Sequence, residues 1–145
     1  MPVGVKHIGK SAFEKADMDD SHLVFPNGLE YIGDTAFSHV QSYTSELIIP
    51  DTVTYIGLNA FRDFREPSVL KLPNSDCEIS EGAFLIYRLT TVEIPENIKS
   101  ISEDAFERGK ITMIVSAGSY GELFAKENGF NYSISGQEDD LSWLN

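Results

Sequence analysis

The fold is decided by the stretch Val53-Thr54-Tyr55-Ile56-Gly57-Leu58-Asn59-Ala60-Phe61, because its second part, Ile-Gly-x-x-Ala-Phe, recurs along the chain. With serine replacing glycine in the last two copies, the phrase occurs five times, starting at Ile8, Ile32, Ile56, Ile79 and Ile101. Six residues before these isoleucines stand Pro2, Pro26, Pro50, Pro73 and Pro95, so successive units are 24, 24, 23 and 22 residues long. A fixed period of this length predicts a solenoid of stacked units.

An apolar triplet ends each unit just before the next proline or the end of the repeats. The triplets are Leu23-Val24-Phe25, Leu47-Ile48-Ile49, Leu70-Lys71-Leu72, Val92-Glu93-Ile94 and Met113-Ile114-Val115. Each is expected to form a short strand whose first and third side chains point inward and whose middle side chain points outward. Proline then stops the strand, since it has no N–H for the next hydrogen bond.

The remainder of each unit supplies a second set of core positions. The pairs Val5/Ile8, Leu29/Ile32, Val53/Ile56 and Ile98/Ile101 are expected on the core side of a tight turn or short strand. In the fourth unit Asp76 replaces the first apolar residue and Cys77 follows, which predicts a distorted turn. The Gly/Ser-x-x-Ala-Phe segment predicts one or two turns of helix, with alanine allowing close approach and phenylalanine filling the space between units. Because ordering one unit costs more than its few apolar side chains return, the units must stack.

The repeat gives way to a helix signal after Val115. Ser119 and Glu122 form a capping box, Gly129 is the expected stop, and Phe130 can fold back on Phe124. The helix is expected to cover the open end of the core with one face, formed by Tyr120, Leu123 and Phe124. Residues 131–134 predict a last strand. The predicted organisation is therefore a repeat domain over 1–135, with units starting near 2, 26, 50, 73 and 95 and a cap at about 116–135, followed by an acidic tail over 136–145 that contains Trp143.

Composition limits the partners and the compartment. The chain has 145 residues, and its 23 acidic against 11 basic residues give a net charge of -12, which argues against nucleic acid. The acidic surface could attract basic proteins or simply keep the chain in solution. A single cysteine, Cys77, excludes an internal disulfide and a CxxC metal site, and it is expected to be a small packed side chain. No apolar run suits a membrane span or signal peptide. The location stays open: cell surface or secreted for a fragment of a longer exported protein, cytoplasmic if the chain starts at Met1.

The unit strand-Pro-x-x-Val-x-x-Ile-Gly-x-x-Ala-Phe, which has no asparagine at the turn after the strand, resembles the BspA-type leucine-rich repeats of bacterial surface proteins. The run from Gly118 to Gly129 is similar to the terminal cap of those arrays. The resemblance implies a right-handed leucine-rich-repeat superhelix, mainly β with short helical turns and closed by a C-terminal capping helix. It also implies adhesion or protein binding, with host extracellular proteins among the partners, and it implies no cofactor and no catalytic residues.

Few residues suggest other chemistry. The three histidines occupy different repeat positions, and no HExxH, GxSxG, GxGxxG or P-loop pattern is present. The cluster Asp19-Asp20-Ser21-His22 could attract a metal or build a Ser-His-Asp relay, but a solvated polar loop is its ordinary explanation. The tail residues 138–140 lack the glycine and spacing of a calcium loop. We expect a non-enzyme without catalytic, cofactor or metal sites, and a hydrolase or metal-binding protein using 19–22 remains the remote alternative.

The outward strand positions define the candidate partner-binding face. The columns are Val24, Ile48, Lys71, Glu93, Ile114 and His22, Glu46, Val69, Thr91, Thr112. Within them Val24, Ile48 and Val69 predict a small apolar patch, of the kind that marks an interaction site unless a neighbouring loop shields it. The main hypothesis is an adhesion or ligand-binding module using this face. The alternative is a C-terminal fragment that closes a longer repeat array.

The N-terminal end raises a separate question, because nothing before Pro2 covers Val5, Ile8 and Phe13. An uncovered solenoid end offers a free parallel edge and apolar core to solvent. We therefore expect self-association through the first repeat or cover by repeats of a longer protein. The remaining possibility is that residues 14–22 fold back as a cap.

Overall fold

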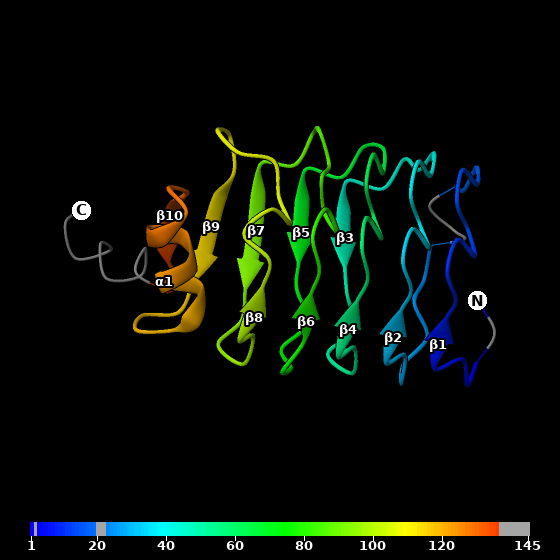
Figure 1. Ribbon diagram of the computed structural model, residues 1–145, viewed down its shortest axis with the longest axis horizontal. Helices are drawn as coiled ribbons and strands as arrows, with labels where there is room; N and C mark the ends of the chain where they lie inside the picture. Colours follow the sequence, from blue (N-terminus) through cyan, green and yellow to red (C-terminus); the bar gives the residue numbers. More distant parts are fainter. Residues whose placement is uncertain (2, 20–22, 137–145) are drawn as a thin grey trace.

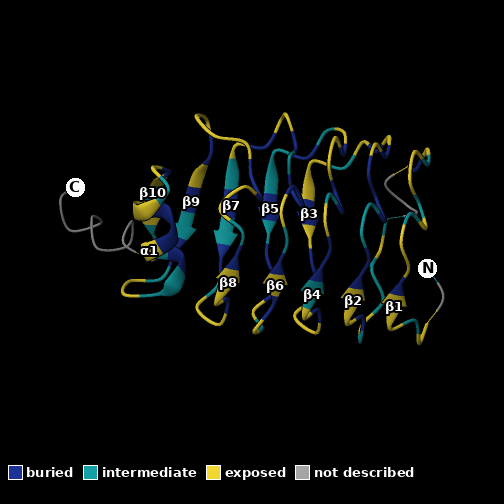
Figure 2. Cartoon of the chain, viewed as in Figure 1, coloured by how far each residue is buried: buried dark blue, intermediate teal, exposed yellow. Residues whose placement is uncertain are grey.

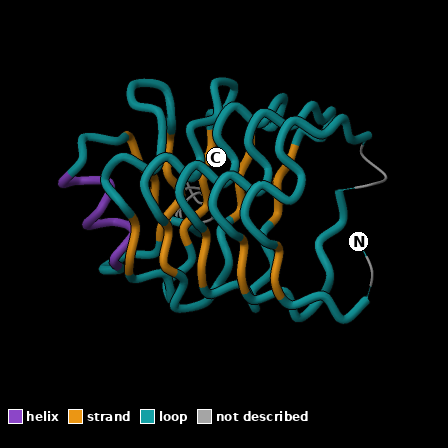
Figure 3. The backbone as a smooth tube through the Cα atoms, turned by 45° about the vertical axis from the view of Figure 1, so that its right-hand side comes forward, coloured by secondary structure: helices purple, strands orange, loops and turns teal. Residues whose placement is uncertain are grey.

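The computed structural model, which describes residues 1, 3–19 and 23–136, is a β-solenoid of about six turns with one short helix near the C-terminal end (Figure 1). Two rows of strands run along it, as Figure 3 makes plain from a second direction. Strands of successive turns pair in parallel, and each row contains five of them. The predicted repeat solenoid is thereby confirmed.

The two sheets differ in strand length. The first has the order β1-β2-β4-β6-β8 and the second the order β10-β9-β7-β5-β3. The first sheet consists of the two-residue strands β1 (His7–Ile8), β2 (Tyr31–Ile32), β4 (Tyr55–Ile56), β6 (Glu78–Ile79) and β8 (Ser100–Ile101). The second consists of β3 (Glu46–Ile48), β5 (Val69–Lys71), β7 (Thr91–Ile94), β9 (Thr112–Val115) and β10 (Asn131–Ile134). The second residue of each predicted pair thus lies in the first sheet, and the last four predicted triplets overlap strands of the second.

The predicted alternation holds in the second sheet. Leu47 and Ile49 are buried while Ile48 between them is exposed, and the same inward pattern recurs through β5, β7 and β9. The buried residues form one continuous core along the solenoid axis (Figure 2). Stacking therefore gives each central turn a dry interior on both of its sides.

The first triplet is an exception. Leu23-Val24-Phe25 forms no strand and pairs with no described residue of β3, so the expected strand there is wrong. A terminal segment has a neighbour on one side only and gains fewer hydrogen bonds for the same loss of chain entropy. The side-chain alternation persists nevertheless: Leu23 and Phe25 pack against the core, and Val24 faces solvent.

The phenylalanines of the repeat phrase form a ladder through the core. The rings of Phe13, Phe37, Phe61, Phe84 and Phe106 stack face to face at successive centroid distances of 5.2, 5.0, 5.2 and 5.8 Å. Aromatic pairs at such separations contribute beyond the area they bury. The predicted role of phenylalanine between units is confirmed, and Phe61 in the middle is fully buried.

The segment before each ladder phenylalanine forms successive reverse turns, so the expected helical turns are wrong. Ser11, Thr35 and Asn59 have φ of 57°, 53° and 54°, and a residue with positive φ interrupts a right-handed helix. The turns bond within the unit, as from Ser38 N–H to the Thr35 carbonyl, and to the next unit, as from Phe37 N–H to the Ala60 carbonyl. This second bond extends the parallel ladder beyond the strands.

Close approach of consecutive turns explains the glycine of the phrase in the second and third units, Gly33 and Gly57. A Cβ at Gly33 would lie 2.8 Å from the carbonyl carbon of Gly9, closer than real contacts allow. The φ of Gly33 is not positive, which agrees with the serines found at this position in later units. Space, and not backbone conformation, selects glycine here.

The fourth unit differs from the others only at the turn after Pro73, where residues 74–76 form a bend, while β6 keeps the regular register with both of its neighbours. Cys77 is buried in the core, whereas Asp76, at the position of the missing apolar residue, is exposed. Burial raises the pKa of the Cys77 thiol to about 12, so the thiol stays protonated and unreactive at neutral pH. The expectation of a small packed side chain is confirmed.

The cap matches most of its prediction. Helix α1 (Tyr120–Glu127) begins after Ser119, whose side chain accepts from Glu122 N–H at 3.2 Å. Gly129 has φ of 73°, and Phe130 N–H bonds to the Ala125 carbonyl, which is a Schellman ending. Phe130 stacks on Phe124 at 5.9 Å, and β10 pairs in parallel with β9.

One residue of the predicted helix face is misplaced. Leu123 is 52% exposed, because the buried face is formed by Gly121, Phe124 and Ala125. At 100° per residue Leu123 points almost opposite to that face. The helix, coloured orange at the end of the solenoid in Figure 1, still covers the core next to β9 and β10.

Parts of the sequence-based interpretation lie outside the described residues. These are the acidic tail from 137 onward with Trp143 and residues 138–140. In the described part of the chain, no helix is long and apolar enough to cross a membrane.

Candidate binding surface

The outward positions of the second sheet line up in two columns across the strands. One column runs through Ile48, Lys71, Glu93, Ile114 and Ser133, and the other through Glu46, Val69, Thr91, Thr112 and Asn131. Of the candidate residues, these columns contain Ile48, Lys71, Glu93, Glu46 and Val69, in the order that the repeat predicts. Val24 lies outside the sheet, since segment 23–25 forms no strand. The sheet therefore places side chains from several distant segments on one surface held by parallel hydrogen bonding.

The apolar part of this surface lies at the β3 end. Val24 is 66% exposed and Ile48 is 54% exposed, whereas Val69 is half-buried. Between the unpaired segment 23–25 and β3 lies a shallow groove of about 320 Å³. Its lining includes both Val24 and Ile48, with Glu46 at the side. Exposed apolar side chains beside a groove are the usual character of an interaction site.

Lys71 joins the polar part of the surface. Its Nζ lies 2.8 Å from Glu46 Oε1 and 3.6 Å from Glu93 Oε2. The hydrogen bond to Glu46 and the charges of both carboxylates raise the pKa of Lys71 above its ordinary value. The ammonium group therefore stays charged, and it holds the two glutamates in place across β3, β5 and β7.

The alternative site at Asp19-Asp20-Ser21-His22 lies mostly outside the described residues, as does His22 as a member of the binding face. Within the described ranges, no group of three or more His, Cys, Asp and Glu side chains is arranged to hold a metal ion.

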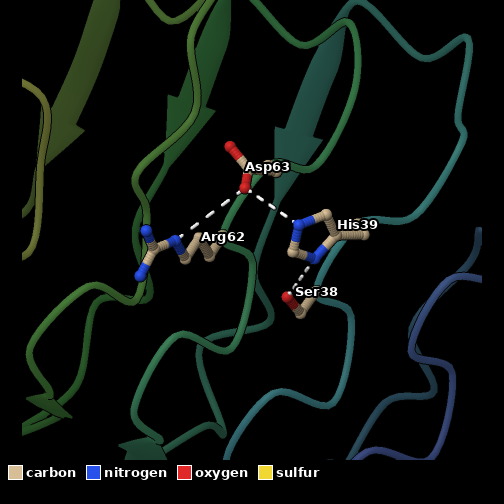
Figure 4. A network of polar contacts seen from close by, with 4 residues as sticks. All are labelled: Ser38, His39, Arg62 and Asp63. Atoms are coloured by element: carbon tan, nitrogen blue, oxygen red, sulfur yellow. Dashed lines mark hydrogen bonds and ion pairs between the residues drawn. The ribbon is translucent and has the colours of Figure 1, made fainter.

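The structure does bring a serine, a histidine and an aspartate together elsewhere. Ser38 Oγ lies 2.8 Å from His39 Nδ1, and His39 Nε2 lies 3.1 Å from Asp63 Oδ2 (Figure 4). Arg62 Nε approaches the same oxygen of Asp63 at 3.8 Å. Ser38 is only 3% exposed, which makes its hydroxyl a poor nucleophile for an external substrate.

The contacts have a direct structural explanation. His39 and Asp63 occupy the same position in consecutive units, two residues after the ladder phenylalanine, and both have positive φ. The contact between His39 and Asp63 therefore ties two neighbouring turns together at the solenoid surface. Sequence reasoning missed this network because it compared the histidines with one another and not with the equivalent residue of the next unit.

A row of aromatic side chains on the first sheet was also missed. Register places His7, Tyr31 and Tyr55 in one column, with Tyr31 and Tyr55 stacked at 4.8 Å and His7 5.7 Å from Tyr31. The stack buries one ring against another and supports strand pairing. Reading the residue before each repeat isoleucine as a column would have found it.

Comparison with known proteins agrees with the geometry. A family model described as the BspA type leucine-rich repeat region matches residues 6–135 in six copies. No curated protein and no solved structure matches the chain.

Proposed function

Because this chain belongs to the BspA-type leucine-rich repeat family, we propose that it binds another protein through the exposed face of its second sheet. Leucine-rich-repeat solenoids are typically non-catalytic and in general mediate contacts between proteins. An adhesive role, with host extracellular proteins as the first partners to test, is the specific form of this proposal. It rests on the family and on the surface together.

The observation that carries the proposal is the pair Val24 and Ile48 beside their groove. Two large apolar side chains that remain more than half exposed leave water-covered area that a partner can bury. The groove is suited to an apolar side chain of the partner protein, and the charges of Glu46, Lys71 and Glu93 form a polar rim. Apolar centres with polar rims characterise protein interfaces.

Photo-crosslinking identifies the face that binds. A crosslinking amino acid at position 48 should capture a discrete partner, whereas the same group at Leu58, which is 45% exposed elsewhere on the solenoid, should not. The double substitution Val24→Glu, Ile48→Glu should then lower the affinity of the chain for the purified partner by about tenfold or more. Unaltered affinity of the double variant would place the site elsewhere.

The alternative function is closure of a longer array, favoured by the complete cap formed by α1 and β10. The two functions are compatible, since a terminal fragment can also bind. We further propose the domain division at residue 135, with 136–145 as a tail. Limited proteolysis that removes only the tail would support this division, and cleavage inside the turns would contradict it.

Self-association through the first repeat is a further prediction. Phe13 is only half-buried, and Phe37 is the ladder ring that stacks on it. Sedimentation at rising concentration should reveal a dimer that Phe13→Ser weakens. A strictly monomeric chain at high concentration would contradict this branch.

A further inference from the structure

All four arginines of the chain follow a ladder phenylalanine within four residues, in a protein whose net charge is -12. Arg65 and Arg88 stand four residues after Phe61 and Phe84, and Lys110 stands four residues after Phe106. Three consecutive units therefore carry a cation at the same repeat position. We refer to Arg65, Arg88 and Lys110 as the cation column.

Contacts between units confirm that the column is contiguous. Arg65 Nη1 donates to the Oε1 atom of Gln41, the equivalent residue of the preceding unit, at 2.8 Å. Arg65 and Arg88 line one pocket of about 350 Å³, and Tyr87 forms part of its wall. Lys110 Nζ lies 3.8 Å from the centre of the Tyr87 ring. Backbones of neighbouring turns lie about 4.8 Å apart, so these like charges repel one another.

The carboxylates of the pocket are already engaged. Asp63 pairs with His39 at 3.1 Å, and Glu66 lies 3.4 Å from Arg65 Nε. Among the residues that the structure describes, Arg88 and Lys110 form no ion pair with a carboxylate. Two cations of the column are thus available to an external anion, and Tyr87, which is 76% exposed, offers an aromatic surface beside them.

We propose that the cation column and its pocket bind an acidic segment of a partner protein. Guanidinium groups pair with carboxylates through two parallel hydrogen bonds, and Arg88, which has no carboxylate partner among the described residues, is free to form such a pair. Because the chain carries a net charge of -12, unpaired cations such as Arg88 and Lys110 are the places where an acidic segment meets attraction and not repulsion. This site is separate from Val24 and Ile48, and it does not depend on the strand face.

The test uses the intact protein and a fluorescein-labelled decamer of glutamate, followed by fluorescence anisotropy at low salt. The wild type should bind this peptide and not a decamer of glutamine. The double variant Arg88→Ala, Lys110→Ala should weaken binding by about tenfold or more, since hydrogen bonds to charged groups are the stronger ones. The matched double variant Lys99→Ala, Lys126→Ala removes the same charge from exposed lysines outside the column and should change the affinity less than about twofold.

Three results would overturn the proposal. The first is an absence of glutamate-decamer binding to the wild type, and the second is an equal loss in both double variants. The third is tighter, arginine-dependent binding of a heparin oligosaccharide, which would assign the column to an anionic polysaccharide. The variant Val24→Ser, Ile48→Ser should leave peptide binding intact, so failure of the strand-face proposal is distinguishable from failure of this one.

Discussion

Phe13 and Phe61 close the same phrase in the first and third units, yet Phe61 has a ladder ring on each face whereas Phe13 stacks on Phe37 alone. The preceding sequence differs little between the units. Phe61 is nevertheless fully buried and Phe13 only half-buried. The burial of a ladder phenylalanine therefore depends on the neighbouring turns that pack against it.

The apolar triplets of the first and second units show the same contrast between a terminal and an internal position. Leu47-Ile48-Ile49 enters β3 and its flanking side chains are buried, whereas the similar Leu23-Val24-Phe25 stays outside the sheet. Phe25 still reaches the ladder, with its ring 5.6 Å from that of Phe37 in an edge-on arrangement. Apolar pattern alone thus directs side chains inward, and strand pairing requires a neighbour that is already in place.

The largest expected effect is at the centre of the ladder. Phe61→Ala should lower the free energy of unfolding by about 3–5 kcal/mol, because it leaves a cavity between two rings. Phe13→Ala should cost clearly less, since part of its ring is already in contact with water. Urea denaturation of both variants measures the difference. Equal losses would contradict a stack that encloses its middle more than its first turn.

The next comparison concerns the triplets. Leu47→Ala should destabilise the chain by about 2–5 kcal/mol, because Leu47 is fully buried in a paired strand. Leu23→Ala, at the equivalent but half-buried position, should cost less than half as much. Thermal unfolding monitored by circular dichroism provides the measurement. A larger loss at Leu23 would mean that segment 23–25 is an essential part of the sheet.

The capped end offers a third and smaller effect. Ser119→Ala removes the acceptor of Glu122 N–H and should cost about 1 kcal/mol. Ser119→Asp, which keeps an acceptor and adds a favourable charge at the helix start, should retain most of the stability. Chemical denaturation distinguishes them. If both variants lose the same stability, the hydroxyl has some role other than capping.

The smallest effect is expected at the exposed face. Val24→Ser and Ile48→Ser should each change the unfolding free energy by within about 0.5 kcal/mol, as surface substitutions usually do. These variants therefore separate binding from folding in the functional test. A loss comparable with that of Leu47→Ala would show that the residue packs inside the fold.

Much of the fold could be predicted because it follows from local rules. The phrase fixed the period, the alternation around Ile48 identified the inward positions, and Ser119 with Gly129 marked both ends of α1. The turns before each phenylalanine were mistaken for helix because a type I β-turn and a single turn of 3₁₀-helix have similar backbone angles and the same hydrogen bond between residues three apart. The two structures differ in the positive φ of residues such as Thr35. Serine, threonine and asparagine adopt this conformation here, and no sequence pattern indicates it.

The sites depended on register between units, which local rules do not provide. The strand-face columns were predictable because strand alternation is simple, although burial separates Ile48 from Val69. The cation column was not recognised, because Arg65, Arg88 and Lys110 lie in connections whose common position emerges only when the ladder phenylalanines are aligned. Surface sites of a repeat protein are therefore found by comparing equivalent positions across successive units, and not by examining each unit alone.

Native-state hydrogen exchange at two matched amides tests the central claim most directly. Phe13 N–H bonds to the Ala36 carbonyl and Phe61 N–H to the Ala83 carbonyl, each at 2.8 Å. If neighbours on both sides supply stability, Phe61 N–H should exchange only through global unfolding and Phe13 N–H through a local opening of lower free energy. Equal protection of the two amides would contradict this account of the solenoid.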